Sequence, residues 1–263
     1  MSKNIRFFFI FILGFTVYYL FDLFYFKSIQ FFIKDLLHSK TIAHVLAYTI
    51  TLIPLIITLK ILFPKKGILD LFSVNQSIFK GFSLAFIGTL PMLIGYAIHF
   101  RLSDSINSET LFINTVSSAF FEEIIFRSFL IGTLYRFTRL GFLSSILLGS
   151  LLFAQVHLYQ SQNIVELIEI FAITFLGSVF FAWVYFEENF NIWSAIFLHF
   201  FMNLYWELFN VSDNVSGNLF GNLYKLLSIF LIIGMIVFHK KKKNHPYHVI
   251  WKNLFIKSKE VQS

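Results

Sequence analysis

Apolar segments long enough to cross a lipid bilayer make up most of this 263-residue sequence. A helix of about 20 apolar residues spans the roughly 30 Å hydrocarbon core. Charged residues make up 13% of the chain, whereas an ordinary soluble domain has roughly 25%. The sequence therefore predicts an all-α fold, a polytopic transmembrane bundle of about eight helices. Their approximate limits are 5–26, 42–63, 78–100, 111–135, 142–158, 164–186, 192–209 and 219–239.

The apolar segments follow one another without an internal repeat or a low-complexity linker. We therefore expect residues 1–263 to form a single integral membrane domain that ends in a basic cytoplasmic tail at 240–263. The formal charge of +7 comes from Lys and Arg between the spans and in the tail. That placement is typical of topology signals and head-group contacts, and it argues against nucleic acid as a partner. The absence of cysteine excludes disulfides, thiolate catalysis and cysteine metal sites.

The distribution of Lys and Arg predicts the orientation in the membrane, because cytoplasmic loops are enriched in these residues. An arrangement with both termini inside leaves the outer segments with few of them: Lys27, Lys34, Lys40 and Arg101. It gives the inner segments the larger share: Lys3, Arg6, Lys65, Lys66, Lys80, Arg136, Arg139 and the Lys240–Lys243 run. We therefore expect a multi-pass protein of the cell membrane, surrounded by the lipid bilayer, with both termini in the cytoplasm.

Three charged residues interrupt the apolar stretch Ser117–Leu130, SSAFFEEIIFRSFL. In the hydrocarbon core, each such charge costs about 2.5 to 3.5 kcal/mol on insertion scales. Glu123 and Arg127 are four residues apart, so a helix places them on one face as an ion pair. Glu122 lies about 100° around the helix from Glu123 and has no such partner on its own helix. One carboxylate is thus neutralised locally, and the other is available for chemistry.

Two later apolar segments also carry polar side chains. His157 lies in the first of them, and His199 and Asn203 share a face of the second because they are four residues apart. One water-filled or protein-lined cavity would keep all of them, and Glu122, away from lipid. Glutamate and histidine can share the removal of a proton from water, and histidine and asparagine can donate hydrogen bonds to an oxyanion. The set fits acyl hydrolysis by an activated water, provided that the three helices converge.

Other interpretations of these residues stay open. Glu122, His157 and His199 have the chemistry of three zinc ligands with an open position, although the sequence has no HExxH motif. Glu122, Glu123 and Arg127 are alternatively an interhelical polar clamp with a structural role. A transporter with a buried proton relay would also place ionisable groups inside the membrane.

Three motifs carry a resemblance to a known family. EEIIFR, which begins at Glu122, fits EExxxR; FAQVH, which ends at His157, fits FxxxH; and HFFMN, from His199 to Asn203, fits HxxxN. In this order, on separate apolar helices, they resemble the CPBP family, the CAAX-protease and bacteriocin-processing membrane proteins also called the Abi family. The resemblance spans the chain from the first motif to the last, and it predicts a family core at about 78–209.

The resemblance implies a glutamate-dependent intramembrane endopeptidase that cleaves a membrane-associated peptide or protein. By motif position, Glu122 and His157 activate the water, His199 and Asn203 stabilise the oxyanion, and the second Glu and the Arg of EExxxR hold the site together. No cofactor and no metal are implied. The family's best-known substrates are prenylated CAAX proteins, whereas bacterial members more often process peptides or confer bacteriocin immunity. A non-proteolytic immunity or scaffold protein with the same polar core is the alternative, and the oligomeric state stays open.

The remaining charged residues are expected at surfaces. Asp22 lies near one end of the first apolar segment and is interpreted as an interfacial or helix-end carboxylate. Glu187 and Glu188 have no basic residue four positions on, so we expect them in a solvated loop. The Lys240–Lys243 run is interpreted as a stop signal at the lipid head groups.

Overall fold

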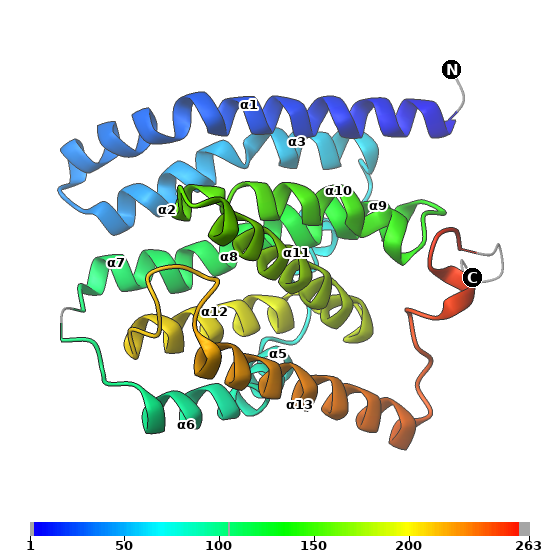
Figure 1. Ribbon diagram of the computed structural model, residues 1–263. Helices are drawn as coiled ribbons and strands as arrows, with labels where there is room; N and C mark the ends of the chain where they lie inside the picture. The colour runs from blue at the N-terminus through cyan, green and yellow to red at the C-terminus, as the bar shows by residue number, and fades with distance from the viewer. Residues whose placement is uncertain (1–2, 105, 258–263) are drawn as a thin grey trace.

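The computed structural model describes residues 3–104 and 106–257, and this part of the chain is built from helices (Figure 1). The first half contains α1 (Lys3–Leu37), α2 (Lys40–Thr51), α3 (Ile53–Leu62), α4 (Ile68–Leu71), α5 (Ile78–Gly88) and α6 (Leu90–His99). One continuous helical segment follows, made of α7 (Ser108–Phe112), η1 (Ile113–Ser117), α8 (Ser118–Glu122), η2 (Glu123–Gly132) and α9 (Thr133–Phe137). The rest contains α10 (Phe142–Gln155), η3 (Leu158–Gln160), α11 (Ile164–Glu187), α12 (Ile192–Leu208), α13 (Leu219–Lys243) and η4 (Trp251–Asn253).

The all-α membrane fold predicted from the sequence is confirmed. Among the described residues, 6 helical segments are long and apolar enough to cross a membrane. They are Lys3–Leu37, Lys40–Leu62, Ile78–His99, Phe142–Gln160, Ile164–Glu187 and Leu219–Lys243. The other two of the roughly eight predicted spans coincide with the helical segment 108–137, which carries the charged EExxxR motif, and with α12, which has 17 residues. The count of eight therefore stays a prediction.

Helix α1 is longer than the span predicted at 5–26. It continues through 35 residues to Leu37, about 52 Å at 1.5 Å per residue. The same helix continues beyond the apolar run through a segment that contains polar residues such as Lys27 and Lys34. The interpretation of Asp22 as a helix-end carboxylate was wrong, because the helix extends well past it in both directions.

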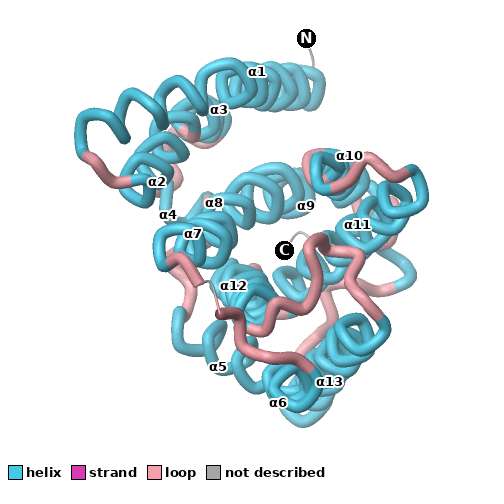
Figure 2. The backbone as a smooth tube through the Cα atoms, turned by 60° about the vertical axis from the view of Figure 1, so that its left-hand side comes forward, coloured by secondary structure: helices cyan, strands magenta, loops and turns pink. Residues whose placement is uncertain are grey.

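Helix α12, which carries the HxxxN motif, lies at the centre of the bundle. Helix α1 packs on α2 and α3, and Figure 2 shows these three helices on one side of the molecule. Helix α12 lies in the middle, in contact with α5, α11 and the segment 108–137 (Figure 2). Helix α10 packs against α11 and η2, and α13 packs against α5 and α6. The polar motif residues are thus surrounded by helices that can face lipid.

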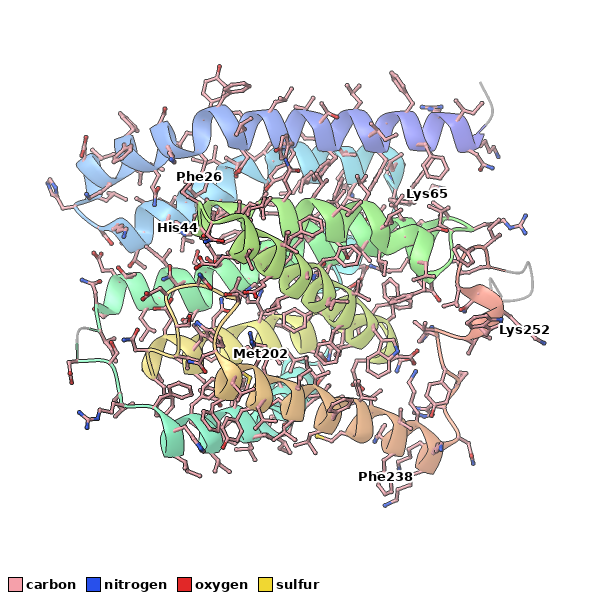
Figure 3. The ribbon with its side chains drawn as sticks, in the orientation of Figure 1. Phe26, His44, Lys65, Met202, Phe238 and Lys252 are labelled. Carbon is pink, nitrogen blue, oxygen red and sulfur yellow. The ribbon has the colours of Figure 1, made fainter. Side chains whose placement is uncertain are left out.

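Lys65 and Lys252 lie at one end of the bundle, and His44 lies toward the opposite end (Figure 3). The N-terminal end of α1 and the C-terminal ends of α9 and α13 are at the same end as the two lysines (Figure 1). Basic residues from distant parts of the sequence therefore gather at one end of the molecule.

A buried ion pair ties the end of α13 to the end of α11. The amine of Lys240 contacts the carboxylate of Glu187, and these residues are 2% and 1% exposed. The same carboxylate accepts backbone N–H groups of His248 at 3.3 Å and Val249 at 2.8 Å. The interpretation of Glu187 as a residue of a solvated loop was therefore wrong. Lys240 is buried in this pair and does not contact lipid head groups, whereas the exposed lysines at 241–243 can. The partner of Glu187 is 53 positions away, so no local pattern reveals it.

Replacing Lys240 by Met is expected to release the chain after α13. The substitution leaves the Glu187 carboxylate buried and unpaired, which costs about 3 to 5 kcal/mol in comparable buried pairs. Chymotrypsin should therefore cut residues 244–257 at least several-fold faster in Lys240→Met than in the wild type. The exposed neighbour Lys241 provides the control, and Lys241→Met should leave the cleavage rate unchanged. Equal rates for the two variants would contradict a stabilising role for the pair.

Candidate active site

The EExxxR motif lies where the helix changes its winding. Helix α8 ends at Glu122, and the π-helical segment η2 begins at Glu123. Such wider turns occur frequently at functional sites. The Nε atom of Arg127 lies 3.1 Å from Oε2 of Glu123, and both side chains have 0% exposure. The ion pair predicted from the four-residue spacing therefore forms in the structure.

Two aromatic rings complete the surroundings of Arg127. The centre of its guanidinium group lies 4.0 Å from the centroid of the Phe153 ring and 5.4 Å from that of Phe181. Cations are attracted to the faces of aromatic rings, most strongly where water is excluded. Phe153 is the aromatic residue of FxxxH, so the second motif stabilises the charge of the first. The sequence alone had not assigned this role to Phe153.

His199 is oriented by the same carboxylate that pairs with Arg127. Its Nδ1 lies 2.8 Å from Oε1 of Glu123. An ionised carboxylate only accepts hydrogen bonds, so Nδ1 of His199 carries the proton and donates it. The other ring nitrogen, Nε2, then faces Glu122, with 4.0 Å between Nε2 and Oε2. That distance is too long for a direct hydrogen bond and suits a bridging water.

His157 contacts Phe153, the residue that packs against Arg127. It follows the end of α10, and its Nδ1 lies 2.7 Å from the backbone oxygen of Phe153. Because a carbonyl oxygen only accepts, Nδ1 is the donor, and Nε2 of the neutral ring keeps a lone pair that can take a proton. Glu122 and His199 are both close enough to act electrostatically on His157. The described contacts include no hydrogen bond between His157 and either of them.

Asn203 lies one turn beyond His199 on α12, but its hydrogen bond goes to a residue outside the group formed by the glutamates and histidines. Its Nδ2 donates to the backbone oxygen of Asn114 at 2.9 Å, and Asn114 in turn donates to Glu207 at 3.0 Å. A carboxamide nitrogen has two N–H groups, so the second remains available. The structure thus brings Glu122, Glu123, Arg127 and both histidines together, and it places Asn203 at the margin of the group.

Glu122 also lines a cavity of about 130 Å³ between α1, α2, η2 and α10. Helix α1 contributes Tyr18 and Asp22 to this cavity, and α2 contributes Tyr48. One carboxylate oxygen of Glu122, Oε2, has no hydrogen-bond partner among the described residues, and its side chain is 19% exposed. Asp22, which the sequence predicted at a helix end, lines this cavity beside Glu122. Its signal was a carboxylate within an otherwise apolar run.

A zinc site needs closer ligands than this arrangement provides. Two zinc ligands at a tetrahedral angle lie about 3.4 Å apart, since each is about 2.0 to 2.1 Å from the metal. Glu122 Oε2 and His199 Nε2 are 4.0 Å apart. Within residues 3–104 and 106–257, no group of three His, Asp or Glu side chains is placed to hold a metal ion.

Comparison with known proteins identifies one family. The model of the type II CAAX prenyl endopeptidase Rce1-like family matches residues 104–205, less than half of the chain. The matched segment contains the EExxxR, FxxxH and HxxxN motifs, from Glu122 to Asn203. No match was found among curated proteins or among solved structures. The family inferred from the three motifs is therefore confirmed over this segment, which resembles the Rce1-like members of the CPBP family of membrane proteases.

Proposed function

We propose that this protein is a CPBP-type intramembrane endopeptidase that hydrolyses a peptide bond of a membrane-associated peptide or protein. The observation that carries the proposal is the approach of Glu122 and His199 from two different helices beside a cavity. Their facing atoms are 4.0 Å apart, so a water molecule can bond to both. The match of residues 104–205 to a CAAX endopeptidase family supports the same chemistry.

The charges of the site indicate how a proton is stored there. Glu122 and Glu123 carry two negative charges and Arg127 one positive charge, so a neutral His199 leaves a net charge of −1. A buried cluster favours neutrality, because an uncompensated charge is costly away from water. We therefore infer that one proton is held between Glu122 and Nε2 of His199. This proton allows the same pair of side chains to act as base and as acid.

The proposed reaction begins when Glu122, assisted by the lone pair on Nε2 of His157, takes a proton from the water. The water oxygen attacks the carbonyl carbon, and the resulting oxyanion accepts hydrogen bonds from Nε2–H of His199 and the free N–H of Asn203. The C–N bond then breaks as Glu122 returns the proton to the amide nitrogen, which leaves a carboxylic acid and an amine, and the acid proton then passes to the released amine. Positioned acids and bases typically contribute 10²- to 10⁴-fold, and an oxyanion donor about 10²- to 10³-fold.

The orientation and organisation are part of the proposal. We place the end that holds Lys65 and Lys252 in the cytoplasm, because the positive-inside rule puts basic segments there (Figure 3). Both termini are then cytoplasmic, and the chain is one integral membrane domain with its core near 78–209. The expected partners are the bilayer and a peptide substrate, without nucleic acid or cofactor.

Peptides released by cells test the function. A strain that lacks the gene should lose one or more peptide products, and the wild-type gene should restore them. Glu122→Ala should fail to restore them, whereas Glu109→Ala should restore them fully, because Glu109 is exposed on the same helical segment. Full restoration by Glu122→Ala would instead support a non-proteolytic scaffold or immunity protein.

The effect of a chelator on peptide release distinguishes the proposed mechanism from a metal-dependent one. Isolated membranes that contain the protein should release the same peptides with and without a strong chelator. Loss of release that added zinc reverses would contradict the proposed mechanism and support a metalloprotease.

A further inference from the structure

A second carboxylate shares the cavity with Glu122. Asp22 lines it from α1, and its Oδ1 is buried without a hydrogen-bond partner. Thr51 is its polar neighbour. Within residues 3–104 and 106–257, no Lys, Arg or His forms an ion pair with Asp22. The residue is partly exposed, and a carboxylate that is incompletely hydrated and has no basic partner in the protein favours a cation that arrives from outside the chain.

Two phenol groups provide further acceptors in the same cavity. Tyr18 is 5% exposed, and neither its hydroxyl nor that of Tyr48 forms a hydrogen bond within the described part of the chain. The charges of Asp22 and Glu122 act electrostatically on both hydroxyl groups. With Tyr19, five oxygen-bearing side chains therefore surround a space whose lining contains no basic residue.

Much of the cavity wall is aromatic. Phe15, Tyr18, Tyr48 and Phe126 are among its lining residues. Tyr48 stacks on Phe121 with ring centroids 4.7 Å apart, which restrains the position of its ring. Aromatic faces attract cations and also pack against the alkyl part of a long side chain. The lining thus combines negative charge with surfaces that suit an extended cationic side chain.

The size of the cavity narrows the choice of occupant. A volume of about 130 Å³ is similar to that of a protein cavity of roughly 150 Å³ that binds benzene. It therefore has room for one side chain and is too small for a phospholipid head group with its glycerol. A lysine or arginine side chain has the charge that complements this lining, and one such side chain fits this volume.

We propose that this cavity is a substrate subsite for a Lys or Arg side chain, with Asp22 as the residue that determines this specificity. The inference rests on the proposed function, because Glu122 both lines the subsite and is proposed to activate the water. A side chain bound there lies within about one or two residues of the bond to be cleaved, since each extended residue spans roughly 3.3 to 3.6 Å. The substrate class is then a membrane-associated peptide with a basic residue next to the cleavage site.

Cleavage of a defined peptide mixture tests the subsite. Full-length protein in lipid nanodiscs is incubated with a set of synthetic apolar peptides. Each peptide carries one Lys, Arg, Gln or Glu, and the position of that residue is varied along the peptide. The wild type should prefer Lys and Arg near the cleaved bond. Asp22→Asn should lower kcat/KM for these peptides by about 30-fold, mainly through KM, and leave the Gln peptides unchanged. Asp22→Lys should shift the preference to Glu.

The matched control is Asp35→Asn, which removes an exposed carboxylate from the same helix and should change nothing. Thermal unfolding of each variant establishes that it is folded. Wild-type cleavage without a preference for basic residues would overturn the subsite and leave the proposed function intact. An equal loss of kcat for every peptide in folded Asp22→Asn would also overturn it, since that result assigns Asp22 to the chemistry. A wild type that cleaves no more than Glu122→Gln would refute the proposed function, and the subsite with it.

Discussion

Replacing Glu122 by glutamine lowers kcat by about 10³-fold and changes the free energy of unfolding by less than about 0.5 kcal/mol. Glutamine keeps the shape of the side chain but cannot take a proton from water. The facing atom, Oε2, has no hydrogen-bond partner, so the substitution breaks no hydrogen bond of that oxygen. Cleavage rates of the purified protein in nanodiscs, together with thermal unfolding, measure the two quantities separately.

The control for this variant lies on the same helical segment. Glu109→Gln makes the same chemical change at an exposed position, and it should retain full activity and stability. The proposal for Glu122 fails if the glutamine variant keeps more than about a tenth of the wild-type kcat, since general acid–base groups contribute at least about 10²-fold.

Replacing Arg127 by methionine has the largest expected effect on stability, a loss of about 3 to 5 kcal/mol. The substitution leaves the carboxylate of Glu123 without its cation in a site where both side chains have 0% exposure. It also removes the contact between the guanidinium group and the ring of Phe153. Activity should fall as well, because Glu123 orients His199 through the 2.8 Å hydrogen bond. Thermal unfolding in detergent and peptide cleavage are the measurements.

A double variant separates stability from catalysis. Glu123→Gln combined with Arg127→Met removes both charges, so much of the lost stability should return. The activity should stay low, because glutamine does not hold the His199 proton as a carboxylate does. Arg139→Met, at an exposed position after the same helical segment, is the control. If the folded fraction of Arg127→Met cleaves peptides at the wild-type rate, the charges form only a structural clamp.

The features of the site that could be predicted from the sequence are those that depend on residues of a single helix. The four-residue spacing of Glu123 and Arg127 predicted their ion pair, and the order of the three motifs predicted the family whose model matches residues 104–205. Both follow from neighbours in sequence, since residues four apart share a helix face. The assignment of catalytic roles to these residues stays a prediction until the variants are measured.

The contacts between helices needed the structure. Phe153 packs against Arg127 from another helix, and Lys240 pairs with Glu187 across 53 positions. Asp22 faces the cavity of Glu122, although its position in the sequence suggested a helix end.

The sequence by itself determined that the chain forms long apolar helices and that three of them carry the polar motifs. Helix formation and membrane insertion depend on local composition, which a single sequence contains. Only the tertiary structure decided which faces of those helices meet. Rotation and packing of one helix against another depend on many side chains at once, so a carboxylate such as Asp22 is assigned to a cavity only when all helices are in place.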